Sequence, residues 1–312
     1  MSLENFSIIL CPTAEQARQY EPDITVEAEY GNICIEGKDL TLAHHGDRSD
    51  NPAPCNTEVE PRDHGLIVIS HIDLDTIGGV LACSGDKLND PEFWKGAEHI
   101  DVHGSHHMHD LDPYVQDQLN AVYAWNSEQE RVRYIEPTEV RDVIRENQQF
   151  LEKVIDRNHP EHEQVLEKGR EWERDVTKAV EDRCVFENEY VRAFSTDGVF
   201  CSASYYSERQ QEIVPCTVSY NEKFHSITVA FADGGRENGG EHSAREIVQH
   251  LWGPEAGGRD GIAGSPRGQE MTREDLDKAV DYCLDRIIER NLEREEAERE
   301  AQRDVEKNMP PR

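Results

Sequence analysis

Several features are scarce in this sequence of 312 residues, and each absence narrows its function. The eight cysteines have no C-x-x-C spacing and are scattered along the chain, which indicates reduced thiols and neither a zinc knuckle nor a disulfide framework. No apolar run approaches the roughly 18 residues that a bilayer-spanning helix needs, and the amino terminus lacks a basic region with a cleavage site. The sequence therefore predicts a cytoplasmic protein with no membrane partner.

Positive charge is also scarce. The chain has 33 Lys and Arg residues against 65 Asp and Glu, which gives a net charge of −32. Because such a field repels a long polyanion at moderate salt, we expect no binding of long duplex nucleic acid. A small anion held by bound cations is compatible with this charge. With 36% apolar residues, the chain can form the cores of two domains.

The strongest functional signal is the stretch from Leu66 to Ala82, LIVISHIDLDTIGGVLA. Its first four residues are apolar and mostly β-branched, which predicts a strand buried on both faces, and the run after the two glycines predicts a helix. Between them lie His71, Asp73 and Asp75. Open α/β sheets bind ligands outside the carboxyl ends of their strands. One Asp would be explained as a helix cap, but two with a histidine favour a metal site.

A second group of potential ligands follows His99–Val102, a segment with strand-like composition. Asp101 would lie at the end of this strand, and His103, His106 and His107 surround the Gly-Ser that follows it. A histidine-rich surface loop is the alternative to a metal site. The cluster also contains His109, Asp110 and Asp112.

Both ligand loops would leave the carboxyl ends of strands in one sheet. We therefore expect Asp73, Asp75, Asp101 and at least one of His106 and His107 to converge on one metal centre.

Another histidine pair, His44-His45, follows the expected strand Leu40–Ala43. This pair is equally compatible with a functional site and with a polar loop. Upstream, Ile24–Val26 and Ile33–Ile35 flank a turn and predict a hairpin.

The rest of the chain predicts a helical middle and a second domain. Residues 113–183 are charged and poor in glycine, with apolar residues three and four apart, which indicates helices. Strands are expected at 199–206, 213–219 and 226–232, followed by a glycine-rich irregular loop at 253–268 whose N–H groups can reach an anion. A surface turn is the alternative. A final helix has a narrow apolar seam that packs on its own body or on a second copy in a homodimer.

The pattern S/T-H-x-D-x-D-x-x-G resembles the first motif of the DHH phosphoesterases, which include RecJ-type exonucleases and oligoribonucleases. His71, Asp73, Asp75 and Gly78 match it. Asp101 resembles the lone aspartate of the second motif. The remaining motifs correspond less directly, and the sequence leaves their assignment open.

For the third motif, His106-His107 can stand for its histidines, with Ser105 in place of the family's aspartate. His44-His45 precedes the first motif, whereas the family's DHH triplet follows it. Either the order is rearranged or this pair serves another purpose. The fourth-motif aspartate has three candidates, Asp175, Asp182 and Asp197.

The glycine-rich loop resembles the G-G-H-x-x-A-A-G signature of DHHA1 domains, the substrate-binding partners of many DHH domains. Gly257, Gly258, Ala263 and Gly264 match, and Arg259 replaces the histidine. An arginine preserves phosphate binding because its fork suits phosphate oxygens. The resemblance implies substrate binding by Gly257, Gly258, Arg259, Gly264 and Arg267.

Together the two resemblances imply an α/β fold with a parallel-sheet DHH-like domain at 1–192, including the helical segment 113–183. A smaller mixed α/β DHHA1-like domain would follow at 193–268, and a charged helix at 269–312.

The implied function is that of a metal-dependent phosphoesterase acting on a phosphodiester or phosphoanhydride of a nucleotide or short oligonucleotide. Two Mn²⁺ ions are expected, with Mg²⁺ or Zn²⁺ as alternatives. Two other functions remain open: a zinc-type hydrolase built on the histidine cluster, and a catalytically silent nucleotide-binding protein. The expected metal ligands are His71, Asp73, Asp75, Asp101, His103, His106 and His107, and the expected catalytic residues are His71, Asp73, Asp75, His106 and His107.

Overall fold

The computed structural model describes residues 2–30, 33–44, 48, 50–129, 135–197, 201–233, 235, 238–240, 242–266 and 268–308. The chain forms two compact units, Met1–Asp175 and Val176–Arg312, and each is described by itself. Over these described ranges, no helix is both long enough and apolar enough to cross a bilayer.

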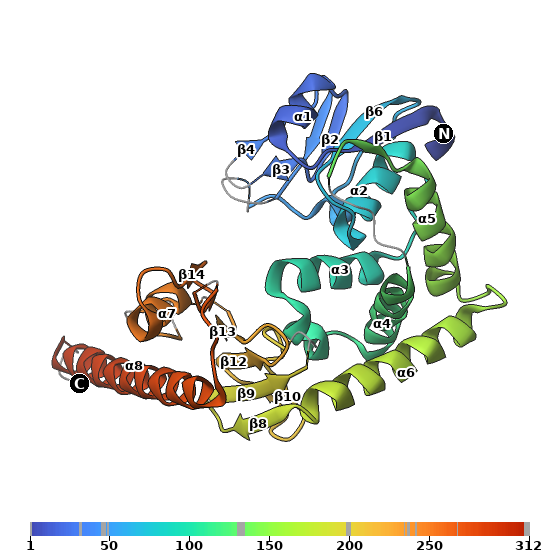
Figure 1. The fold of residues 1–312 in the computed structure, drawn as a ribbon. Helices are drawn as coiled ribbons and strands as arrows, with labels where there is room; N and C mark the ends of the chain where they lie inside the picture. The colour runs from blue at the N-terminus through green and yellow to red at the C-terminus, as the bar shows by residue number, and fades with distance from the viewer. Residues whose placement is uncertain are drawn as a thin grey trace. The chain divides into compact units, whose positions relative to one another are not determined.

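The first unit is built on a five-stranded sheet with the order β5-β2-β6-β1-β7 (Figure 1). Four of its strands are parallel, and β7 pairs antiparallel with β1 at one edge. The strands are β1 (Phe6–Leu10), β2 (Ile24–Val26), β5 (Leu40–Leu42), β6 (Gly65–Ile69) and β7 (Thr138–Glu139).

Both faces of this sheet are covered. Ile67 and Ile69 of β6 pack into the larger core with the helices on one face, while Val68 packs on the other face with residues in and next to α1 and the β3-β4 hairpin. All three side chains are fully buried, which confirms the predicted strand. The larger core includes residues of α2 (Leu74–Ser84), α3 (Pro91–His103), α4 (Pro113–Glu128), α5 (Arg141–Ile155) and α6 (His162–Glu181). The smaller core includes residues of α1 (Ala14–Gln19), Tyr30 of β3 (Glu29–Tyr30) and Ile35, which directly follows β4 (Ile33–Cys34).

Two local predictions in this unit were wrong. Ile24–Val26 does not form a hairpin with Ile33–Ile35, because it is a central parallel strand, and the hairpin is β3-β4. His99–Val102 is not a strand but the last part of α3, because Trp94, Ala97 and Ile100 are buried at helical spacing. Val102, whose β-branched side chain suggested a strand, is 55% exposed.

Helix α2 packs tightly against the segment before β6, and Gly78 makes this packing possible. A Cβ atom at Gly78 would lie 2.5 Å from Cys55 Cβ and 2.7 Å from Trp94 Cζ3. No side chain fits there unless the neighbours move.

We therefore expect Gly78→Ala to lower the free energy of unfolding by about 1–3 kcal/mol in urea denaturation, since overpacking outweighs the helix propensity of alanine. Gln149→Ala, at an exposed position of α5, is the matched control and should change stability little. An unchanged or raised stability of Gly78→Ala would show that the contact with Cys55 relaxes at no cost.

The second unit has a six-stranded mixed sheet with the order β14-β15-β13-β12-β9-β8. Helices α7 (Ala244–Trp252) and α8 (Arg273–Asn308) contribute to its core, with the α8 seam buried from Leu276 to Ile287. The strands are β8 (Cys184–Glu187), β9 (Val191–Thr196), β12 (Cys216–Asn221), β13 (Ser226–Phe231), β14 (Gly257–Gly258) and β15 (Ile262–Gly264), and β10 (Tyr206–Ser207) pairs with β11 (Glu212–Ile213).

The α/β class with one parallel-rich sheet and a second mixed sheet is confirmed. The division expected at residue 192 lies within β9, and β8 and β9 both belong to the second sheet. Part of the glycine-rich segment is regular, contrary to expectation, because β14 and β15 extend the edge of that sheet.

Candidate metal centre

Three neighbouring parallel strands of the first unit bring polar side chains together at their carboxyl ends. Glu27 directly follows β2, His44 follows β5, and Asp75 lies just beyond β6 in the first turn of α2. Because the order of these strands is β5-β2-β6, residues far apart in the sequence become neighbours at one edge of the sheet.

His44 is the centre of this cluster. Its Nε2 atom lies 3.0 Å from Asp101 Oδ2, 3.4 Å from Asp75 Oδ2 and 3.8 Å from Glu27 Oε1. The side chains of Glu27, Asp75 and His44 are only 1%, 3% and 4% exposed, whereas Asp101 is 26% exposed. Three carboxylates therefore surround one imidazole at a largely buried position.

The backbone at Glu27 is held in an unusual conformation, with φ of 50°. The left-handed region costs a residue with a Cβ atom roughly 1–2 kcal/mol, and such strain is concentrated at functional sites. Hydrogen bonds hold this conformation: the Glu27 amide donates to Leu42 O at 2.9 Å, and the Ser70 hydroxyl donates to Glu27 O. The strained residue thus connects all three strands.

His71 and Asp73 form a more accessible pair beside this cluster. His71 Nε2 lies 2.8 Å from Asp73 Oδ2, and the two side chains are 37% and 39% exposed. Asp73 Oδ1 accepts a hydrogen bond of 2.8 Å from the Thr76 amide and caps α2. The helix cap and the contact with His71 therefore use different oxygens of the same carboxylate.

Burial and mutual repulsion shift the protonation of the buried carboxyl groups. Burial, and then the charge of Asp75, raise the pKa of Glu27 to about 8. Burial also raises the pKa of Asp75 to about 6, although a hydrogen bond from the Cys55 amide at 2.7 Å opposes the shift. Burial alone would lower the pKa of His44, but Asp101, Glu27 and Asp75 outweigh it and raise that pKa to about 9.

In the more accessible pair, the pKa of the carboxyl group is lowered, whereas the pKa values of the buried carboxyl groups are raised. Burial would raise the pKa of Asp73, but His71 and the Thr76 amide lower it below the ordinary value. Burial would lower the pKa of His71, but the hydrogen bond to Asp73 raises it. The pair is therefore stabilised as imidazolium and carboxylate.

The buried cluster fits a divalent cation. Ligand atoms of Glu27, His44 and Asp75 all lie within 4.8 Å of one another. Asp75 Oδ2 is buried and makes no hydrogen bond within the described part of the chain. Burying carboxylates side by side is costly unless a positive charge compensates them, and two carboxylates with one imidazole are suitable ligands for Mn²⁺, Mg²⁺ or Zn²⁺.

The histidines that were predicted as metal ligands form a group separate from Glu27, His44 and Asp75. His103 ends α3, and His106 and His107 lie in the short 3₁₀ helix Ser105–Asp110. His107 Nδ1 contacts Asp110 Oδ2 at 2.6 Å. Among described residues, no set of three ligand atoms within 4.8 Å joins these histidines to Asp75.

Sequence reasoning missed Glu27 and left the role of His44 open. The only sequence signal for Glu27 was its place directly after the apolar segment Ile24–Val26. Of the two alternatives for the histidine pair, a site and a polar loop, the buried contact of His44 with Asp75 supports a site. His45 lies outside the described residues, and Asp197 instead pairs with Arg183 at 3.0 Å.

In the second unit, the glycine-rich segment lines an open pocket of about 630 Å³. Arg259 is exposed, and its amide donates to Ile262 O at 2.7 Å. Arg267 lies outside the described residues. The pocket is lined by Trp252, Glu255, Gly257, Gly258, Ser265, Pro266, Gly268 and Gln269.

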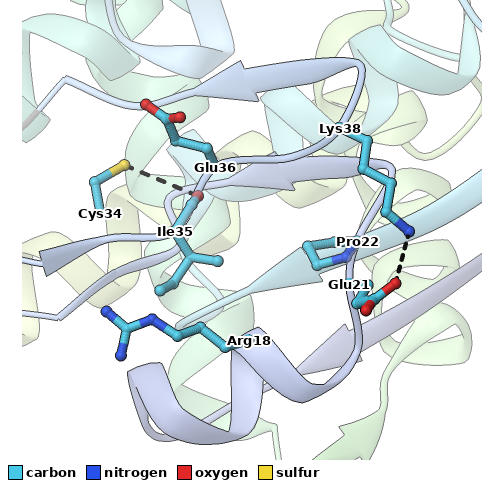
Figure 2. A pocket seen from close by; sticks show the side chains of 7 residues that line it. All are labelled: Arg18, Glu21, Pro22, Cys34, Ile35, Glu36 and Lys38. Carbon is cyan, nitrogen blue, oxygen red and sulfur yellow. Dashed lines mark hydrogen bonds and ion pairs between the residues drawn. The ribbon is translucent and has the colours of Figure 1, made fainter.

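Figure 2 shows a pocket of about 430 Å³ in the first unit. Its Lys38 ammonium pairs with Glu21 at 3.2 Å, and its Cys34 thiol points to Ile35 O. The lining has no histidine and no cluster of buried carboxylates, so it offers less for catalysis than the buried centre. It consists of Arg18, Glu21, Pro22, Cys34, Ile35, Glu36 and Lys38.

Comparisons with known proteins found similarity among solved structures. No family model matches the chain, and no curated protein matches it. Among solved structures, it is similar to the pGpG-specific phosphodiesterase PggH from Vibrio cholerae, with a TM-score of 0.38 and 12% sequence identity. The similarity covers 82% of this chain and 91% of that one. We base the function on the residues of the buried centre.

Proposed function

We propose that this protein is a metal-dependent phosphoesterase that hydrolyses a phosphodiester or phosphoanhydride of a nucleotide or short oligonucleotide. The observation that carries this proposal is the convergence of Glu27, His44 and Asp75 at the ends of three parallel strands. Asp101 completes the group at 3.0 Å from His44. The first-motif resemblance supplies the reaction class.

The side chains divide naturally into two roles. Glu27, His44 and Asp75 would hold a cation, and Asp101 would be a further ligand at the exposed side. When bound, a divalent cation polarises a phosphoryl oxygen and lowers the pKa of water. His71 is oriented by Ser70 at Nδ1 and by Asp73 at Nε2, and its Nε2 proton would pass to the leaving oxygen once that oxygen replaces Asp73 Oδ2 as its hydrogen-bond partner.

Turnover of a defined panel tests the proposal. Short oligonucleotides, cyclic dinucleotides and nucleotide anhydrides should be assayed with Mn²⁺, Mg²⁺ or Zn²⁺ after chelation. Hydrolysis that depends on Mn²⁺ or Mg²⁺ is expected. Binding without turnover would indicate the catalytically silent nucleotide-binding protein, and turnover of non-phosphate esters alone with Zn²⁺ would indicate the zinc-type hydrolase.

The glycine-rich segment of the second unit is proposed to bind the substrate, with Arg259 contacting a phosphate. Arg259→Ala should then raise KM about ten- to a hundredfold and change kcat little, because one charge-assisted contact of roughly 1.5–3 kcal/mol is lost equally in ground and transition states. Steady-state kinetics on the best substrate of the panel measures both constants.

Arg209→Ala removes another exposed arginine of the same unit and is the matched control. Its KM should equal that of the wild type. A large fall in kcat at unchanged KM for Arg259→Ala would instead assign Arg259 to the transition state.

A further inference from the structure

The histidine cluster lies on a different face of α3 from the residue that joins the buried centre. His99 and His103 are four residues apart, so they share one face of the helix. Asp101 is two residues from each, which rotates it by roughly 200° about the helix axis. Since Asp101 contacts His44, the two histidines are directed away from that centre.

The 3₁₀ helix after α3 brings further ligands to these histidines. His107 Nδ1 lies 2.6 Å from Asp110 Oδ2, and His99 Nε2 lies 3.6 Å from the same oxygen. The His103 ring centroid is 4.8 Å from that of His99 and 5.6 Å from that of His107. Two imidazoles therefore face one carboxylate, and a third imidazole lies beside them.

The nitrogen of His99 provides an independent indication of a ligand. Its Nε2 atom is buried and makes no hydrogen bond within the described part of the chain, although the side chain is 31% exposed as a whole. A nitrogen withdrawn from water and aimed at a carboxylate oxygen is arranged as metal ligands are. A surface ion pair between His107 and Asp110 alone would not place His99 there.

We propose that His99, His107 and Asp110 bind a Zn²⁺-class ion at a second site, with His103 as the available fourth ligand. Their ligand atoms already lie within 4.8 Å of one another. A tetrahedral zinc site needs separations of about 3.4 Å between ligands, which small side-chain rotations provide. Imidazole-rich sites favour Zn²⁺, Co²⁺ and Ni²⁺, whereas carboxylate-rich sites also suit Mn²⁺ and Mg²⁺, so the two centres select different ions.

Cobalt titration can test the second site separately from the proposed function. The background is Asp75→Asn, which weakens the buried centre, and the readout is the visible absorption of bound Co²⁺ together with metal content after dialysis against Zn²⁺. We expect this protein to retain one tetrahedral Co²⁺ or Zn²⁺ equivalent. Adding His99→Ala or His107→Gln should weaken the binding of that ion about ten- to a hundredfold.

His64→Ala in the same background is the matched control. His64 is an exposed histidine of the same unit that immediately precedes β6, at the opposite end of that strand from the buried centre. Its replacement should leave the one bound equivalent of Co²⁺ or Zn²⁺ unchanged. Circular dichroism of each variant verifies that it is folded. The proposal is overturned if the Asp75→Asn protein binds no tetrahedral ion, or if His99→Ala and His107→Gln both retain full affinity. Neither outcome depends on whether the protein hydrolyses a phosphoester.

Discussion

Asp75→Asn is expected to remove divalent metal from the buried centre and to lower turnover at least about a thousandfold. The substitution preserves the shape of the side chain and an oxygen that can accept the hydrogen bond from the Cys55 amide, now 2.7 Å long. It removes the negative charge on the oxygen that faces His44 at 3.4 Å. A metal ligand contributes several kcal/mol of transition-state stabilisation, and about 4 kcal/mol corresponds to a thousandfold change in rate.

Asp63→Asn is the matched control, because this exposed aspartate lies before β6, at the other end of that strand. It should bind metal and turn over substrate as the wild type does. Metal content by mass spectrometry, kcat and a thermal melt should be measured on both variants. If folded Asp75→Asn retains metal and turnover, the buried cluster is a structural ion-pair network and catalysis lies elsewhere.

The local part of the centre was predictable from sequence. An apolar strand, three ligand residues and two glycines within one short stretch led directly to β6, the His71–Asp75 segment and α2. Periodicity and residue type are sufficient there because all the parts are neighbours in the chain. The same local signal placed the helical middle correctly.

The rest of the centre depends on pairing between distant segments. Glu27 and His44 meet Asp75 only because β2 lies between β5 and β6, and short strands such as Ile24–Val26 do not specify their partners. Asp101 was expected at a strand end and comes from a helix, yet it reaches the same histidine. For Asp101, the residue was thus easier to predict than the element that carries it.

The pKa shifts of the buried centre predict how its stability depends on pH when no metal is bound. The folded pKa of Glu27 is raised from 4.5 to about 8 and that of Asp75 from 3.8 to about 6. As pH rises through these ranges, the unfolded chain ionises more readily than the folded one, so stability falls. The raised pKa of His44 acts in the same direction, since its contribution is complete below 6.5 and is lost as pH rises through about 9.

Chelator is therefore expected to destabilise the protein much more at pH 8.5 than at pH 5.5. At low pH protons neutralise the buried carboxyl groups. At pH 8.5 Glu27 and Asp75 are largely ionised and His44 is beginning to lose its proton, so a bound cation stabilises the centre more, and deprotonated ligands also bind it more tightly. Metal at about 100 times its Kd adds about 2.7 kcal/mol, or roughly 5–10 °C in Tm for a unit of this size. Thermal melts in EDTA and in Mn²⁺ across this pH range measure the gap in Tm between the metal-free and the metal-bound protein. It should widen steadily with pH in the wild type and nearly close in Asp75→Asn, and a gap that stayed constant or narrowed would mean that Glu27, His44 and Asp75 do not hold the ion.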